Sequence, residues 1–155
     1  MEYQLQRENP IAVFDSGVGG ISVLRELIRI MPEEDFIYFG DSKNAPYGTK
    51  EKEKVRELTI GCARKLFDQG AKGLVVACNT SSALALGVLQ KKLPVPVLGV
   101  IEPGAKEAVR HSKNKKIGII GTKATISSMA YVNAMKRLDP DIEVFSKPCP
   151  LPSAL

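Results

Sequence analysis

The stretch "VVACNTSSALAL", residues 75–86, sets an apolar run directly before Cys78 and a group of small hydrogen-bonding residues. The apolar run is typical of a buried strand, and the residues after it are interpreted as the start of a helix. Cys78 therefore falls at a strand-to-helix junction, where the N-terminal end of the helix favours an anion such as a thiolate. A buried structural cysteine needs no such neighbours, so the stretch predicts a reactive thiol.

Short apolar runs and amphipathic segments alternate in the same way along the rest of the chain. The runs predicted as strands are residues 11–15, 35–40, 73–77, 96–100, 116–121 and 141–145. The first, third and fifth are almost wholly apolar, which is expected for strands buried on both faces of a parallel sheet. Apolar residues spaced by three and four predict helices around 21–31 and 55–66. The sequence therefore predicts an α/β fold, a mostly parallel sheet flanked by helices.

Composition and charge restrict the class of protein. The 155 residues include 44% hydrophobic and 25% charged side chains, enough for one domain and part of another. The net charge is +5, but the basic residues are dispersed, and "KEKEK" (50–54) alternates in sign as on a solvated helix face. No nucleic-acid-binding motif accompanies the charge, so no nucleic-acid partner is expected.

The N-terminal residues and the cysteines predict the compartment. "MEYQLQREN" is polar and lacks the apolar core of a signal peptide, and no apolar stretch approaches the roughly 20 residues of a membrane span. We therefore expect a cytoplasmic protein with reduced thiols and no membrane partner. The three cysteines are widely spaced without a CxxC pair, and the single histidine, His111, lies in a basic loop, so no metal site is expected.

Chemistry-bearing residues gather where the predicted strands end, which is where open α/β sheets bind ligands. The segments at these ends are "DSGVGG" (15–20), "GDSKNAPYG" (40–48), "CNTSS" (78–82) and "GTKAT" (121–125). Each alone is also explained as a tight turn or a helix N-cap. Asp15 and Asp41 are candidate acids for the same cleft as Cys78. No histidine is available to pair with the thiolate, so proton transfer fits better than nucleophilic catalysis.

Five motifs taken together carry a family resemblance. In chain order they are "FDSGVGG", "GDSKNAPYG", "ACNTSSA", "VIEPGA" and "GTKATI". From Ile11 to about Leu151 the chain resembles the cofactor-independent aspartate/glutamate racemase family, and the glutamate racemases within it. The resemblance implies interconversion of L- and D-glutamate for peptidoglycan, without a cofactor, by two thiols on opposite faces of the substrate. It also implies two similar α/β domains around a cleft: residues 1–95 as the first, lacking its closing elements, and 96–155 as the incomplete second.

The resemblance assigns roles to individual residues. It implies that Cys78 is one of the two acid/base thiols. For substrate binding it implies Asp15 and Ser16 near the amino group, and Asn79 and Thr80 beside the α-carboxylate. Pro46, Tyr47 and Gly48 are implied in a loop over the substrate, with Tyr47 and Gly48 at its carboxylate end. Thr122 is implied as a further residue of the cleft. Ser81 stands where the family often has alanine. The partner implied is glutamate as a small-molecule substrate, with a homodimer left open.

The chain departs from the family pattern at its second thiol. The family carries that thiol in a Gly-Cys-Thr-His motif, which does not occur in these 155 residues. Cys149 lies between two prolines with no helix terminus to activate it, so it is not expected to substitute. We therefore expect an N-terminal part of a racemase that folds with marginal stability and does not racemise alone. The alternatives are a non-catalytic binding or interaction module and another amino-acid racemase, such as an aspartate racemase.

Overall fold

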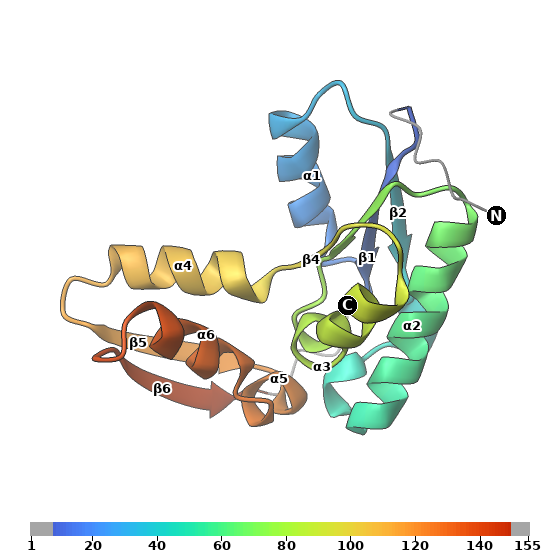
Figure 1. Ribbon diagram of the computed structural model, residues 1–155. Coiled ribbons are helices and arrows are strands. Elements are labelled where there is room, and N and C mark those ends of the chain that lie inside the picture. Colours follow the sequence, from blue (N-terminus) through green and yellow to red (C-terminus); the bar gives the residue numbers. More distant parts are fainter. Residues whose placement is uncertain (1–7, 150–155) are drawn as a thin grey trace.

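The computed structural model describes residues 8–149 and has two groups of elements, which we call the first and second lobes (Figure 1). The first lobe contains β1 (Ile11–Asp15), α1 (Ile21–Ile30), β2 (Phe36–Gly40), the short 3-10 helices η1 (Ser42–Asn44) and η2 (Tyr47–Thr49), α2 (Lys52–Asp68), β3 (Gly73–Val76), α3 (Asn79–Lys92) and β4 (Val97–Gly99). The second lobe contains α4 (Ile101–His111), β5 (Lys116–Gly121), α5 (Lys123–Ser127), α6 (Ala130–Leu138) and β6 (Glu143–Pro148).

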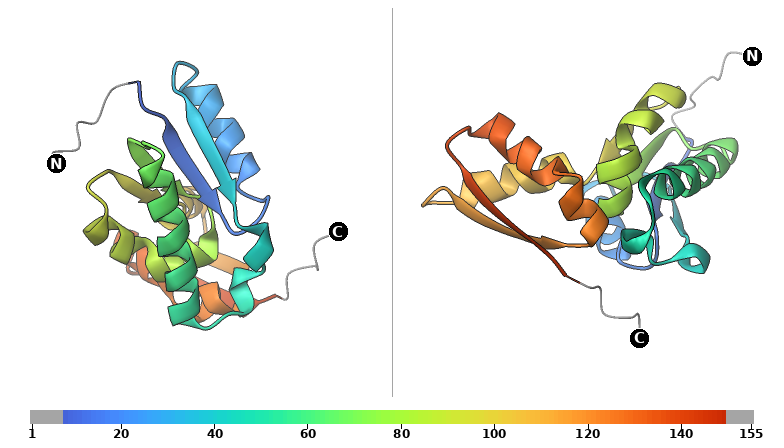
Figure 2. Two further views of the ribbon diagram at one scale, coloured as in Figure 1. Left: turned by 90° about the vertical axis from the view of Figure 1, so that its right-hand side faces the viewer. Right: turned by 90° about the horizontal axis from the view of Figure 1, so that it is seen from below.

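The four strands of the first lobe form one parallel sheet in the order β2-β1-β3-β4. Helices α1 and α2 lie on opposite faces of this sheet (Figures 1 and 2). The main core lies on the α2 side, where Phe14, Val76 and Leu66 are buried with Tyr47. The predicted parallel α/β arrangement is confirmed. Helices lie on both faces of this sheet because its apolar strands must be shielded from water on both sides.

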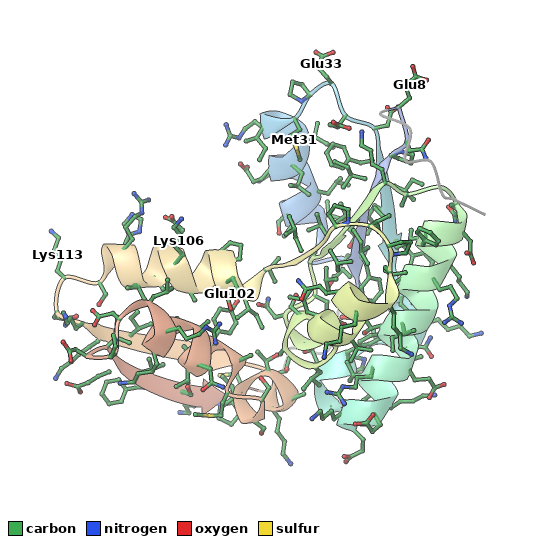
Figure 3. The ribbon with its side chains drawn as sticks, in the orientation of Figure 1. Glu8, Met31, Glu33, Glu102, Lys106 and Lys113 are labelled. Carbon is green, nitrogen blue, oxygen red and sulfur yellow. The ribbon has the colours of Figure 1, made fainter. Side chains whose placement is uncertain are left out.

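The second lobe is a parallel pair, β5 and β6, packed on α4 and α6. Its core includes Ile101 and Ala105 of α4 and Met135 of α6. Glu102, in the first turn of α4, forms an ion pair with Arg137 of α6, while Lys106 points away from the sheet (Figure 3). The proline-containing segment at residues 90–105 holds the end of α3, the strand β4 and the start of α4.

The prediction that the fifth strand is buried on both faces is wrong for β5. Ile117 and Ile119 pack against the second-lobe core, but Ile120, on the opposite face, is 76% exposed. The physical reason is that α4 and α6 both lie on one side of the β5–β6 pair (Figure 2, right), and no described helix covers the other side. None of the helices within residues 8–149 is long and apolar enough to cross a membrane.

Candidate functional site

The carboxyl ends of β1, β2 and β3 meet at one edge of the first-lobe sheet because the strands are parallel and in register. Asp15 pairs with Gly40, and Phe14 pairs with Val76. The ladder continues past the strand ends, since the Asp41 N–H donates to the Asp15 carbonyl over 2.9 Å. The loops that carry the predicted site residues therefore leave the sheet side by side.

Asp15 organises the glycine-rich turn before α1. Its Oδ2 accepts hydrogen bonds from the Gly17 N–H at 3.2 Å and the Gly20 N–H at 3.0 Å. A Cβ atom on Gly20 would lie 2.7 Å from the Asp15 Cβ and 3.0 Å from the Ala77 Cβ. Glycine is thus required where α1 begins against the ends of β1 and β3, and the Asp15 carboxylate occupies the N-terminus of α1.

Cys78 is the N-cap residue of α3 and is buried, with 5% of its surface exposed. Its Sγ accepts the Ser81 N–H at 3.4 Å, and its thiol donates to the Ser16 Oγ, also at 3.4 Å. A backbone N–H at a helix N-terminus is a donor that stabilises a negatively charged sulfur. The geometry therefore confirms that Cys78 stands at a strand-to-helix junction, with one backbone donor, the Ser81 N–H, on its sulfur.

Tyr38 of β2 belongs to this cluster and is absent from the sequence-based site. Its hydroxyl donates to the Gly17 carbonyl at 2.9 Å. Burial, with smaller contributions from the charges of Asp15 and Cys78, raises the pKa of Tyr38 to about 12. The phenol therefore remains a neutral donor at physiological pH, and only its position within the apolar run at residues 35–40 could have marked it in the sequence.

The side chain of Tyr47 points into the protein core. Only 1% of Tyr47 is exposed, its ring lies 6.2 Å from that of Phe14, and its hydroxyl donates to Asp41 Oδ2 at 2.6 Å. The Asn44 amide donates to both carboxylate oxygens of Asp41, at 3.0 and 2.9 Å. Asp41 thus anchors the loop of Pro46, Tyr47 and Gly48 to the core.

Three threonine hydroxyls connect the two lobes. The Oγ1 atoms of Thr80, Thr122 and Thr125 lie 3.0 Å (80 to 122), 3.2 Å (80 to 125) and 3.0 Å (122 to 125) apart. We call this group the threonine ring. Gly48 lies directly against it, because a Cβ atom at position 48 would overlap the Thr122 side chain. The structure therefore brings together three predicted site residues, Gly48, Thr80 and Thr122, from three separate segments.

Asn79 is exposed, and its Oδ1 accepts a hydrogen bond from the Tyr131 hydroxyl at 2.6 Å. Tyr131, on α6, is a second residue that the sequence analysis missed. A pocket of about 540 Å³ is lined by Asn79, Thr122 and Tyr131 among others. A further pocket of about 530 Å³, lined partly by Gly48, lies between the start of α2 and α5. Cys78 lines neither of these two pockets.

The other two cysteines lie in environments that differ from that of Cys78. Cys62 sits on the buried face of α2, where burial and the Asp41 charge raise its pKa, as expected of a structural thiol. Cys149 is partly exposed and its N–H pairs with the Gly121 carbonyl at 2.8 Å. In residues 8–149, no group of three His, Cys, Asp or Glu side chains is placed to hold a metal ion.

Comparison with known proteins identifies the family. The family model for Asp/Glu/Hydantoin racemase matches residues 11–150. This chain belongs to that family. Its relatives include the glutamate racemase of Geobacter metallireducens, which is 51% identical over 141 residues, covering 91% of this chain and 52% of that protein. The racemase-family chain thus spans about half the length of the curated relatives it matches.

Solved racemase structures share the fold of this racemase-family chain. A glutamate racemase isoform from Bacillus anthracis superimposes with a TM-score of 0.90 at 43% identity, over 94% of this chain and 55% of that one. The glutamate racemase of Francisella tularensis, solved in complex with D-glutamate, gives 0.86 at 41% identity, over 93% and 54%. Both therefore match the two lobes together, again over about half of the solved chain.

Proposed function

We propose that this chain carries the first proton-transfer site of a glutamate racemase. The observation that carries the proposal is the placement of the Cys78 Sγ at the N-terminus of α3, between the Ser81 N–H and the Ser16 hydroxyl. The Cys78 thiolate removes the α-proton of glutamate, so that an S–H bond forms as the Cα–H bond breaks. The electron pair stays on the substrate as a carbanion conjugated with its carboxylate, and a donor on the opposite face returns a proton.

The surrounding residues support binding of an amino acid. We propose that Asn79, Thr80 and the backbone of Gly48 bind carboxylate oxygens, with Thr122 completing this side of the cleft. Neutral donors held in place before the reaction stabilise the charge that develops on the carbanion, and no cofactor is needed for that role. Asp15 and Ser16 stand on the Cys78 side, where a substrate ammonium group would balance the Asp15 carboxylate. We propose that Pro46, which is exposed beside the buried Tyr47, also contacts the substrate.

We further propose a metabolic role, a cellular compartment and a domain organisation for this activity. The product D-glutamate serves peptidoglycan synthesis, and a thiol base functions in a cytoplasm that keeps cysteines reduced. Two separate hydrophobic clusters support a division of the chain into parts of two domains, but Val97 of β4 belongs to the first cluster, so the first part extends beyond residue 95 through β4. The second thiol and a homodimer partner belong to the same proposal for the family protein.

Exchange of the α-hydrogen in D2O tests the proposal. The purified chain is incubated separately with L- and D-glutamate, proton NMR follows loss of the α-hydrogen signal, and chiral chromatography follows the enantiomers. We expect exchange of one enantiomer without racemisation, and a decrease of at least about a hundredfold in Cys78→Ala. Cys62→Ala is the matched control and retains exchange, because Cys62 is buried in the α2 core.

Each other outcome has a defined meaning. Equal exchange by the wild type and Cys78→Ala would exclude Cys78 as the base. Racemisation that Cys78→Ala abolishes would show that the chain supplies a second donor and is more than a half-site. Glutamate binding without exchange, in protein shown to be folded, would favour the non-catalytic binding module.

A further inference from the structure

The orientation of the Asn79 side-chain amide decides whether it attracts or repels a carboxylate. Its NH2 group donates hydrogen bonds, while its carbonyl oxygen only accepts them. In the structure the oxygen is already occupied, since Oδ1 accepts from the Tyr131 hydroxyl at 2.6 Å. The NH2 group, on the other branch of the amide, is therefore the part of Asn79 that is available at the pocket it lines with Thr122.

Gly104 makes room for this contact. A Cβ atom at position 104 would lie 3.3 Å from the Tyr131 hydroxyl oxygen and 3.4 Å from a ring carbon. Gly104 is the glycine of the "VIEPGA" motif, to which the proton-transfer site assigns no role. The absence of a side chain in α4 thus lets the phenol of α6 reach across to the first residue of α3.

The Tyr131 hydroxyl retains its proton over the physiological range. Burial raises the pKa of Tyr131 above its usual value, so the neutral phenol persists. An ionised phenol has no proton to donate to Oδ1 and would accept only, from the NH2 group of the amide. A persistent donor opposite Oδ1 is therefore consistent with one fixed amide orientation.

We propose that Tyr131 is a positioning residue that holds the Asn79 amide with its NH2 group directed to the pocket, where it binds the carboxylate of an amino-acid substrate. This inference rests on the proposed function and extends it to a contact between the two lobes. Without the Tyr131 hydroxyl, the amide can present its oxygen, and two negatively polarised groups would then face each other.

A double-mutant cycle with L-glutamate as the probe tests the inference on the full chain. Isothermal titration calorimetry measures the Kd for the wild type, Tyr131→Phe, Asn79→Ala and the double variant. We expect Tyr131→Phe to weaken binding about tenfold, the loss of one charge-assisted hydrogen bond. In the Asn79→Ala background the same substitution has no further effect, because there is no amide to orient. Unchanged affinity in Tyr131→Phe, or losses that simply add, would overturn the proposal.

A second variant tests the same contact in case Tyr131→Phe alters the fold. Gly104→Ala keeps both polar groups and moves the hydroxyl by a few tenths of an ångström, so we expect binding to weaken by a smaller factor with the fold unchanged by circular dichroism. Wild-type affinity in this variant would contradict the role of the Tyr131 contact.

A measurement without ligand separates this inference from the proposed function. Side-chain ¹⁵N relaxation reports the mobility of the Asn79 amide, which we expect to be restricted in the wild type and increased in Tyr131→Phe. A wild-type chain that binds no glutamate would contradict the proposed function. Equal Asn79 mobility in both proteins would contradict the positioning role, whatever the affinity.

Discussion

The hydrogen bond between Tyr47 and Asp41 determines how the loop at residues 46–48 meets the cleft. The bond is 2.6 Å long and lies in the interior, where a phenol or a carboxylate without a hydrogen-bond partner would be destabilising. The loop is thus attached to the core by its largest side chain. Its backbone, including Gly48, is consequently held against the second lobe.

The alkaline stability of the protein should depend on Tyr47. Burial and the hydrogen bond to Asp41 raise the pKa of Tyr47 above its usual value of 10.0. Native Tyr47 keeps its proton while the unfolded chain releases it, so this contribution is fully present below pH 10 and decreases as the pH rises further. Urea unfolding between pH 8 and 11 should show a steeper decrease in the free energy of unfolding for the wild type than for Tyr47→Phe. Equal slopes would contradict the raised pKa.

Sequence patterns identified the candidate catalytic and binding residues but not the partners that orient their side chains. Cys78 was found because a strand, a thiol and a helix start are consecutive in the chain. The interior position of Tyr47 was not predicted, because a nine-residue loop has no periodicity that separates core from cleft. Tyr131 was missed for a related reason: its partner Asn79 lies 52 residues away and in the other lobe.

Helix α3 is attached to its neighbours through Ser82 in its first turn. The Ser82 Oγ donates to the Val76 carbonyl at 2.8 Å and accepts the Val100 N–H at 3.3 Å. One hydroxyl thereby joins β3, α3 and the residue that precedes α4. The geometry of the Cys78 turn depends on this attachment, because Ser82 also donates its N–H to the Cys78 carbonyl at 2.8 Å.

We expect Ser82→Ala to lower the free energy of unfolding by about 1–3 kcal/mol, since it leaves a buried carbonyl and an N–H without their partner. Urea denaturation measures the change. Ser42→Ala is the matched control: Ser42 is exposed, no side-chain hydrogen bond joins it to the described residues, and a change below about 0.5 kcal/mol is expected. A result for Ser82→Ala as small as the control would show that water replaces both bonds.

Strand positions were predictable to within a few residues, but the cover of each strand was not. Apolar runs predict β1 and β5 equally well, yet β1 is buried and β5 has one open face, marked by Ile120 at 76% exposure. The difference lies in what packs on each strand and not in the strand itself. Leu98 of β4 is likewise 64% exposed. Such open apolar faces favour the predicted marginal stability.

The two lobes approach so closely at Gly48 that any side chain there should separate them. In Gly48→Ala the added methyl would overlap Thr122, so we expect a loss of about 1–3 kcal/mol in the free energy of unfolding. Gly61→Ala is the matched control. Gly61 lies within α2 with no atom near its Cβ position, and alanine there should stabilise by about 0.5–1 kcal/mol.

Thermal unfolding of the two glycine variants should therefore shift Tm in opposite directions. A Gly48→Ala protein as stable as the wild type would mean that the lobes move apart without cost. The threonine ring would then be too loose to hold them together.

The threonine ring has a property that its distances do not express. Each hydroxyl has a single proton to donate, so three hydroxyls in mutual contact can donate to one another clockwise or anticlockwise. These two arrangements have the same heavy-atom positions. A ligand oxyanion that accepts a hydrogen bond from any one member breaks the circle into a line, in which the other two hydroxyls still donate in turn toward the member that holds the ligand. Binding of such a ligand thus aligns hydroxyls from both lobes in one direction of donation without moving a backbone atom.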